Sequence, residues 1–137
     1  MTRFVLDCSV TMAWCFEDEA NRYSDAVLTA LSTDQAIVPS LWSLEVANVL
    51  VVSERRGRLS REDAQRFLDL LAGLPITVSP FAPEPAEALA LAREHRLSAY
   101  DAAYLSLALR ARLPIATRDR ALRMAARATR VMPFTPT

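Results

Sequence analysis

The chain has 137 residues, a length that fits one domain over residues 1–137. Apolar residues make up 52% of it, which is enough for a core, and no apolar run reaches the roughly 18 residues that a membrane span needs. The first ten residues lack the apolar stretch of a secretory signal because Asp7 interrupts them. We therefore expect a cytoplasmic protein with no membrane contact.

The net charge is zero, but its distribution along the chain is uneven. Residues 1–54 hold eight acids and two arginines, whereas residues 110–137 hold seven arginines and one acid. All sixteen basic residues are arginine, a bias that we attribute to genomic base composition rather than to phosphate binding. The basic last quarter favours a nucleic-acid contact, although a solvated face would have the same composition.

The apolar pattern predicts short strands alternating with helices. The expected elements, in chain order, are a strand at 4–6, a helix to about 16, a helix at 21–31, a strand at 36–38, helices at 41–56 and 60–73, a strand at 76–78, a helix to about 95, a helix at 100–112, a strand at 115–116, a helix at 120–127 and an edge strand at 131–133. Ser9 is the expected N-cap of the first helix. This alternation predicts an α/β fold with a short parallel sheet covered on both faces.

Helical spacing marks the apolar faces that should be buried. In the helix at 100–112 these positions are 100, 103, 104, 107, 108 and 111, and in the helix at 21–31 they are 26, 27, 30 and 31. Core or dimer contacts are the expected role of four aromatic residues, rather than base stacking: Trp14, Trp42, Tyr100 and Tyr104. The single histidine, His95, is interpreted as solvated, and the two cysteines as reduced.

Four acids stand out because of their positions. Asp7 closes the first strand and Asp119 follows the strand at 115–116, and ligand sites of open α/β sheets form at the carboxyl ends of strands. Glu45 lies in a strongly apolar helix, with Asn48 one turn later on the same face, and Asp101 lies in the first turn of another apolar helix. Taken singly, each acid has a structural explanation, such as helix capping for Asp119 and Asp101.

If the four acids converge, their charges require compensation by protonation or by a cation. Oxygen ligands suit hard ions such as Mg²⁺ or Mn²⁺, which promote phosphodiester hydrolysis. Candidates for attracting a polyanion to such an acidic site are Arg118 and Arg120, beside Asp119, and the arginines at the bend between the helices at 41–56 and 60–73: Arg55, Arg56, Arg58 and Arg61. The residue pattern alone indicates a possible acidic metal site.

At these residues the sequence resembles the PIN-domain family, and within it the VapC-type toxin ribonucleases. Four segments carry the resemblance, in the family's order: FVLDCS at 4–9, SLEVANVL at 43–50, LSAYDAAYLSLA at 97–108 and IATRDRAL at 115–122. The resemblance implies a three-layer α/β/α fold, a homodimer, and endoribonuclease activity dependent on Mg²⁺ or Mn²⁺. It also implies a cognate VapB-type antitoxin that blocks the site.

By position, the resemblance implies catalytic, metal-binding roles for all four acids: Asp7, Glu45, Asp101 and Asp119. Ser9 and Thr117 resemble hydroxyl residues that hydrogen-bond the acids or the substrate, and Asn48 resembles a polar support residue.

Two other functions remain as alternatives. A housekeeping PIN-domain nuclease would process structured RNA, and a non-catalytic RNA-binding module could use the same fold. A phosphatase of the haloacid-dehalogenase type is disfavoured, because its second acid would stand where this chain has Ser9.

Overall fold

A computed structural model describes all residues, 1–137, and contains four strands and seven α-helices. The elements, in chain order, are β1 (Arg3–Leu6), α1 (Cys8–Ala13), the short 3₁₀ helix η1 (Glu17–Glu19), α2 (Arg22–Ala30), β2 (Gln35–Val38), α3 (Leu41–Arg55), α4 (Arg61–Ala72), β3 (Ile76–Val78), α5 (Pro85–His95), α6 (Ala99–Ala111), β4 (Ile115–Ala116) and α7 (Arg120–Ala128). The expected α/β class is confirmed.

The four strands form one parallel sheet in the order β3-β2-β1-β4. In the register, Val5 of β1 pairs with Ile37 of β2 on one side and with Ile115 of β4 on the other. β1 and β4 are therefore neighbours although more than a hundred residues separate them. Their parallel direction brings the carboxyl ends of both strands, and the residues that follow them, to one edge of the sheet.

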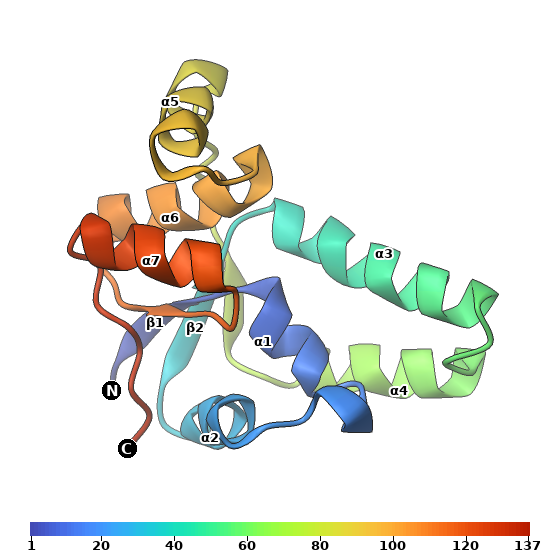
Figure 1. Cartoon of the computed structure of the whole chain (residues 1–137). Helices are drawn as coiled ribbons and strands as arrows, with labels where there is room; N and C mark the ends of the chain where they lie inside the picture. The colour runs from blue at the N-terminus through green and yellow to red at the C-terminus, as the bar shows by residue number, and fades with distance from the viewer.

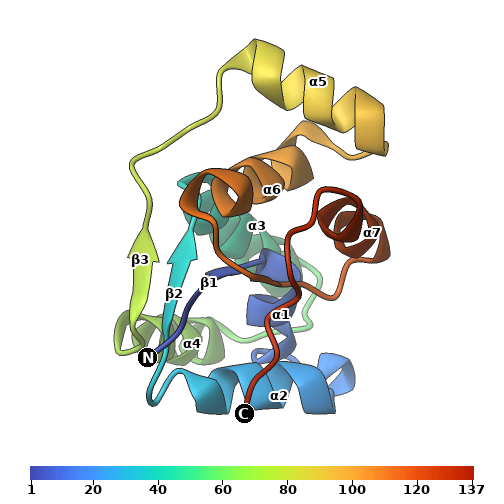
Figure 2. The same cartoon turned by 90° about the vertical axis from the view of Figure 1, so that its left-hand side faces the viewer.

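Helices cover the sheet on both faces (Figures 1 and 2). α6 and α7 lie on one side of β1, and α1 and α2 lie on the other. The pair α3 and α4 extends sideways as a hairpin, and α5 packs on α6 rather than on the sheet. No helix is long and apolar enough to cross a membrane.

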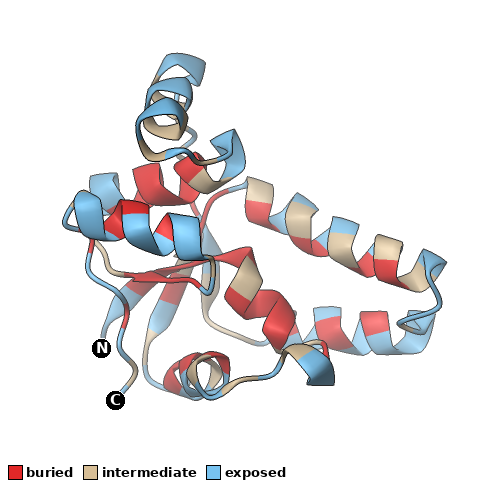
Figure 3. Cartoon of the chain, viewed as in Figure 1, coloured by how far each residue is buried: buried red, intermediate tan, exposed pale blue.

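Buried residues concentrate where these layers meet (Figure 3). Phe4, Val5 and Leu6 of β1 are fully buried, as expected for a central strand enclosed on both faces. Phe4 also stacks on Phe134, with the ring centroids 3.8 Å apart, and this contact ties the C-terminal segment to the sheet. One core cluster of 29 residues runs from β1 to Phe134.

Some local expectations were wrong. Ser9 does not cap α1, because Asp7 occupies the N-cap position, and α1 ends at Ala13 rather than near residue 16. Residues 131–133 form no strand; only the isolated bridge between Ile115 and Pro133 adds to the sheet there. Both cysteines are free, as expected.

The expected apolar face of α6 was also only partly correct. Every residue from Ala102 to Ala108 is buried, because this helix lies between the sheet and α5. Tyr100, expected inside, is 66% exposed, and Ala111 is exposed as well. On α2, Ala26 is exposed although its spacing placed it inward. His95 is not solvated, since only 12% of its side chain is exposed.

Candidate functional site

An acidic pocket lies at the edge of the sheet where the parallel strands β1 and β4 end. Its volume is about 560 Å³, and it is lined by ten residues: Asp7, Cys8, Ser9, Met12, Glu19, Glu45, Val49, Asp101, Arg118 and Asp119. All four acids singled out in the sequence line it. They come from the end of β1, the middle of α3, the start of α6 and the start of α7. The fold therefore collects into one pocket carboxylates that are distant in the sequence.

Asp7 is the buried centre of this pocket, with an exposed fraction of 4%. The Ser9 hydroxyl donates to its Oδ2 at 2.6 Å, and the Thr117 hydroxyl donates to the same oxygen at 2.7 Å. Burial raises the pKa of Asp7, and the charge of Asp119 raises it further, while the two hydroxyl donors oppose this shift. The side chain is thus held in one position by donors that favour its charged form.

Ser9 and Thr117 also join the two strand ends to each other. The backbone N–H of Arg118 donates to Ser9 Oγ at 3.0 Å, and the backbone N–H of Asp119 donates to Thr117 Oγ1 at 3.0 Å. Each hydroxyl therefore accepts from the segment after β4 and donates to Asp7. This network fixes the segment that carries Asp119 relative to β1.

Glu45 is half-buried and is held by Tyr104. The phenol of this fully buried tyrosine donates to Glu45 Oε1 at 2.6 Å, which joins the middle of α6 to α3. Burial raises the pKa of Glu45, the Tyr104 hydrogen bond lowers it, and the charges of Asp7 and Asp101 raise it again. Asn48, expected to support the site, is exposed and does not line the pocket.

Asp101 and Asp119 lie at the N-termini of two helices. Ser98 caps α6 by accepting from the Asp101 N–H at 3.1 Å, and Asp119 caps α7 by accepting from the Leu122 N–H at 2.8 Å. The capping explanation is therefore correct for Asp119, but capping does not exclude a site, since its carboxylate also lines the pocket. Burial raises the pKa of Asp101 to about 6, and the charges of Asp7 and Asp119 contribute.

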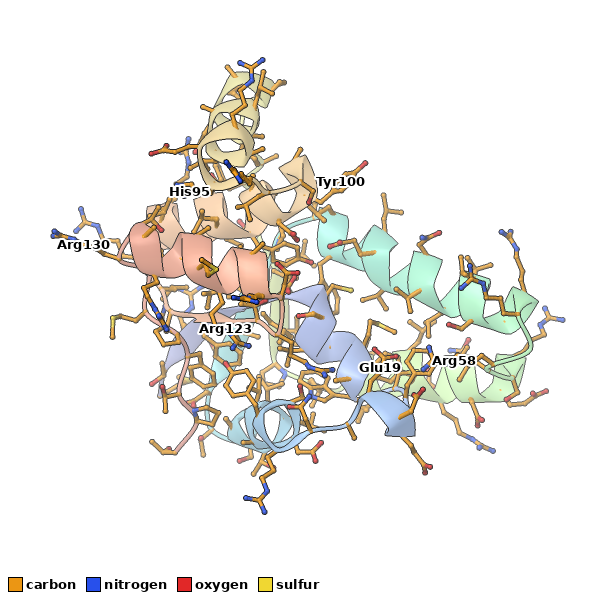
Figure 4. All side chains as sticks on the ribbon, in the orientation of Figure 1. Glu19, Arg58, His95, Tyr100, Arg123 and Arg130 are labelled. Atoms are coloured by element: carbon orange, nitrogen blue, oxygen red, sulfur yellow. The ribbon has the colours of Figure 1, made fainter.

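The sequence reasoning missed a fifth acid, Glu19, which lies on η1 at the rim of the pocket. Arg58, at the bend of the α3–α4 hairpin, contacts Glu19 Oε2 at 3.1 Å and Asp18 Oδ1 at 2.6 Å (Figure 4). The Arg118 guanidinium donates to the Glu19 carbonyl at 2.9 Å. Arg118 is the only cation that lines the pocket, and Arg120 does not line it. Only the acidic run at 17–19 signalled this contribution, and such a run is usually solvated.

The donor set fits a hard divalent cation, because five carboxylates and no nitrogen or deprotonated thiol ligand face one pocket. Burial keeps the Cys8 thiol protonated by raising its pKa. No group of three or more acids stands in the arrangement that would hold an ion. Ion binding would therefore require these side chains to close toward each other, which their mutual repulsion opposes until a cation is present.

The structure has a parallel sheet covered by helices and a carboxylate pocket at one edge of that sheet. These two features make the protein an α/β protein with an acidic site. The sequence model of the PIN domain matches residues 4–128. Ribonuclease VapC3 of Pyrobaculum aerophilum is 30% identical over 122 residues, which are 88% of this chain and 92% of the relative. The chain therefore belongs to the PIN-domain family.

Two solved structures have a similar fold. The crystal structure of PAE2754 from Pyrobaculum aerophilum superimposes with a TM-score of 0.69 at 25% identity, covering 90% of this chain and 86% of that one. The crystal structure of FitAcB from Neisseria gonorrhoeae gives a TM-score of 0.63 at 21% identity, covering 97% of each chain. At that identity, FitAcB supports the three-layer fold alone.

Proposed function

We propose that this chain is a metal-dependent endoribonuclease and that residues 1–137 act as one PIN domain. The observation that carries the proposal is the convergence of Asp7, Glu45, Asp101 and Asp119 on one pocket. Burial and mutual repulsion raise the pKa of three of these four acids, Asp7, Glu45 and Asp101. Such a cluster is stable in its charged form only with a cation. The name of the relative, Ribonuclease VapC3, supports RNA as the substrate.

In this proposal the four acids hold Mg²⁺ or Mn²⁺. The bound ion would supply a Lewis acid for the phosphodiester and would activate water at neutral pH. Ser9 and Thr117 orient Asp7, and Tyr104 orients Glu45, so that neither carboxylate has to be ordered when the substrate binds. Arg118 offers the only positive side chain in the pocket for a phosphate oxygen.

We further propose that the nuclease is the toxin of a VapBC-type pair, with a VapB-type antitoxin as its partner and a homodimer as its assembly. The family membership and the name of the relative support this role. A neighbouring gene for a small DNA-binding protein would support it as well. Expression of the chain with and without that gene tests it directly. Normal growth with the lone chain would favour the alternative of a housekeeping nuclease.

A cleavage assay on total RNA with mapped 5′ ends and a metal titration tests the enzymatic proposal. Wild-type protein should cleave with Mg²⁺ or Mn²⁺ and lose activity in EDTA, and Asp7→Asn and Asp101→Asn should lose cleavage while remaining folded. The matched control is Asp25→Asn, an exposed first-turn aspartate of α2, which should cleave normally. Equal cleavage by wild type and Asp101→Asn, unaffected by EDTA, would refute the mechanism and leave an RNA-binding module as the alternative.

A further inference from the structure

A large cavity beside the acidic pocket is lined by cationic side chains. Its volume is about 890 Å³, and its walls are α7, the start of α2 and the C-terminal segment at 131–136. Four arginines line it: Arg118, Arg123, Arg127 and Arg130. No acidic side chain lines it. The charge of this cavity is therefore opposite to that of the neighbouring pocket.

The arginines are distributed along the length of the cavity. Arg123 and Arg127 are four residues apart on α7 and share a helix face, while Arg118 precedes the helix and Arg130 follows it. Arg123 is directed from α7 toward α2, and Arg130 extends outward at the far end (Figure 4). Since α7 has nine residues and rises by about 1.5 Å per residue, the row of charges spans more than about 10 Å.

None of these four guanidinium groups forms an ion pair. The ion pairs of the chain are formed instead by Arg58, Arg66 and Arg110, apart from a contact of His95 with Glu94. Side-chain hydrogen bonds from the row reach only backbone carbonyls, from Arg118 to Glu19 at 2.9 Å and from Arg123 to Thr117 at 3.4 Å. Positive charges gathered around one cavity repel each other unless an anion lies between them. The cavity is thus suited to an extended anionic ligand.

The cavity adjoins the acidic pocket. Arg118 lines both of them, and Thr117, in the wall of the cavity, donates to Asp7 in the pocket. A nucleic-acid strand with one phosphate over the carboxylates must leave the pocket on either side of that phosphate. On the α7 side it meets only positive charge, whereas α3 and α6 present Glu45 and Asp101.

We propose that this arginine cavity binds the backbone of single-stranded RNA next to the phosphate that is cut. The inference rests on the proposed ribonuclease function and adds the path of the substrate. A repeating polyanion explains both the row of unpaired charges and its position next to the acidic pocket. An acidic protein segment would explain the charges, but it has no need to reach the carboxylates.

The test measures binding of a fluorescent single-stranded oligouridylate in EDTA, at several salt concentrations. The variant is Arg127→Gln/Arg130→Asn, which removes two charges at the far end of the cavity; Arg130 has a φ of 63°, a backbone conformation that asparagine tolerates. The matched control is Arg93→Gln/Arg96→Asn, from the last turn of α5 and the left-handed residue after it, neither of which lines the cavity. Thermal denaturation checks that both variants are folded.

We expect the cavity variant to bind RNA at least about tenfold more weakly at 50 mM salt and to lose about 1.4 from the slope of log K against log salt, because two phosphate contacts disappear. The control should bind like wild type. Equal affinity and slope for wild type and the cavity variant would overturn the inference while leaving the cleavage assay, and thus the proposed function, intact. Binding of polyglutamate is measured in parallel. If the cavity variant binds RNA like wild type but no longer binds polyglutamate, the inference is overturned in favour of an acidic protein partner. If the cavity variant loses RNA binding and the wild type cleaves no RNA, RNA binding by the cavity is supported and the proposed ribonuclease activity is refuted.

Discussion

Replacing Asp101 with asparagine should stabilise the metal-free protein at neutral pH. Burial, with repulsion from Asp7 and Asp119, raises the pKa of Asp101 from 3.8 to about 6. The folded state therefore binds this proton more tightly than the unfolded state does. The contribution of Asp101 to the stability of the wild type is therefore greatest below about pH 4, falls as the pH rises toward 6, and stays at the lower value above it. Asparagine keeps the shape of the side chain and removes this loss.

The size of the gain follows from the shift and its screening. A pKa raised from 3.8 to about 6 corresponds to at most about 3 kcal/mol. Because the side chain is only half-buried, solvent screening reduces this to roughly half. The N-terminus of α6 stabilises the charge by roughly 0.5 kcal/mol, which the variant loses. The net gain at pH 8 is about 1 kcal/mol, or roughly 3–5 °C in Tm.

Urea and thermal denaturation in EDTA, at pH 4 and pH 8, measure this effect. Asp101→Asn should be more stable than wild type at pH 8 and should match it at pH 4, whereas Asp25→Asn should show no gain at either pH. Saturating Mg²⁺ should reverse the order, since only the wild type gains binding energy in the folded state. A variant that is less stable than wild type at pH 8 in EDTA, or a gain independent of pH, would show that the four acids do not repel each other as the structure implies.

Three further predictions concern neighbours of the acids. Tyr104→Phe removes the donor to Glu45, so the pKa of Glu45 should rise further and the rising limb of the pH profile of cleavage should move to higher pH; an unmoved profile would make Tyr104 a packing residue only. Thr117→Val removes the donor to buried Asp7 and the acceptor of the Asp119 N–H, so the free energy of unfolding in urea should fall by about 1–3 kcal/mol. The control Thr29→Val, on the exposed face of α2, should lower it by less than about 1 kcal/mol. Cys8 should resist alkylation in the native protein at pH 8, because burial raises the pKa of its thiol, and rapid modification before unfolding would contradict its placement.

The order of the elements and the convergence of the acids could be predicted because local sequence specifies both. An acid that directly follows a strand lies at the carboxyl end of that strand, and these ends share one edge of a parallel sheet. Asp7 and Asp119 therefore lie at one edge, as expected. Caps were predictable where a serine preceded a helical pattern, as at Ser60 and Ser98. These features depend on neighbours in the sequence, which the chain displays directly.

The remaining features depend on contacts that the sequence does not display. Tyr104 reaches Glu45 across 59 residues, and its only signal was that a phenol in an apolar helix needs a hydrogen-bond partner. The burial of α6 on all sides, unlike the one-sided pattern expected, follows from α5 packing over it. Ser9 was expected to cap α1, but Asp7 holds the N-cap position and the Ser9 hydroxyl donates to Asp7. Its second partner, the Arg118 N–H, comes from the segment after β4, which the local sequence does not display.

The order of the strands has a consequence for synthesis of the protein in the cell. β1 is synthesised well before its neighbour in the sheet, β4. The hydrogen bond from Thr117 to Asp7 joins residues that are 110 positions apart. A nascent chain that stops short of residue 115 lacks Asp119, an acid of the pocket, and also lacks β4 and the Thr117 hydroxyl that donates to Asp7. Since the ribosome adds about 5–20 residues per second, the unfinished chain exists for several seconds without a complete centre. The proposed nuclease activity therefore depends on a segment that is synthesised more than a hundred residues after Asp7.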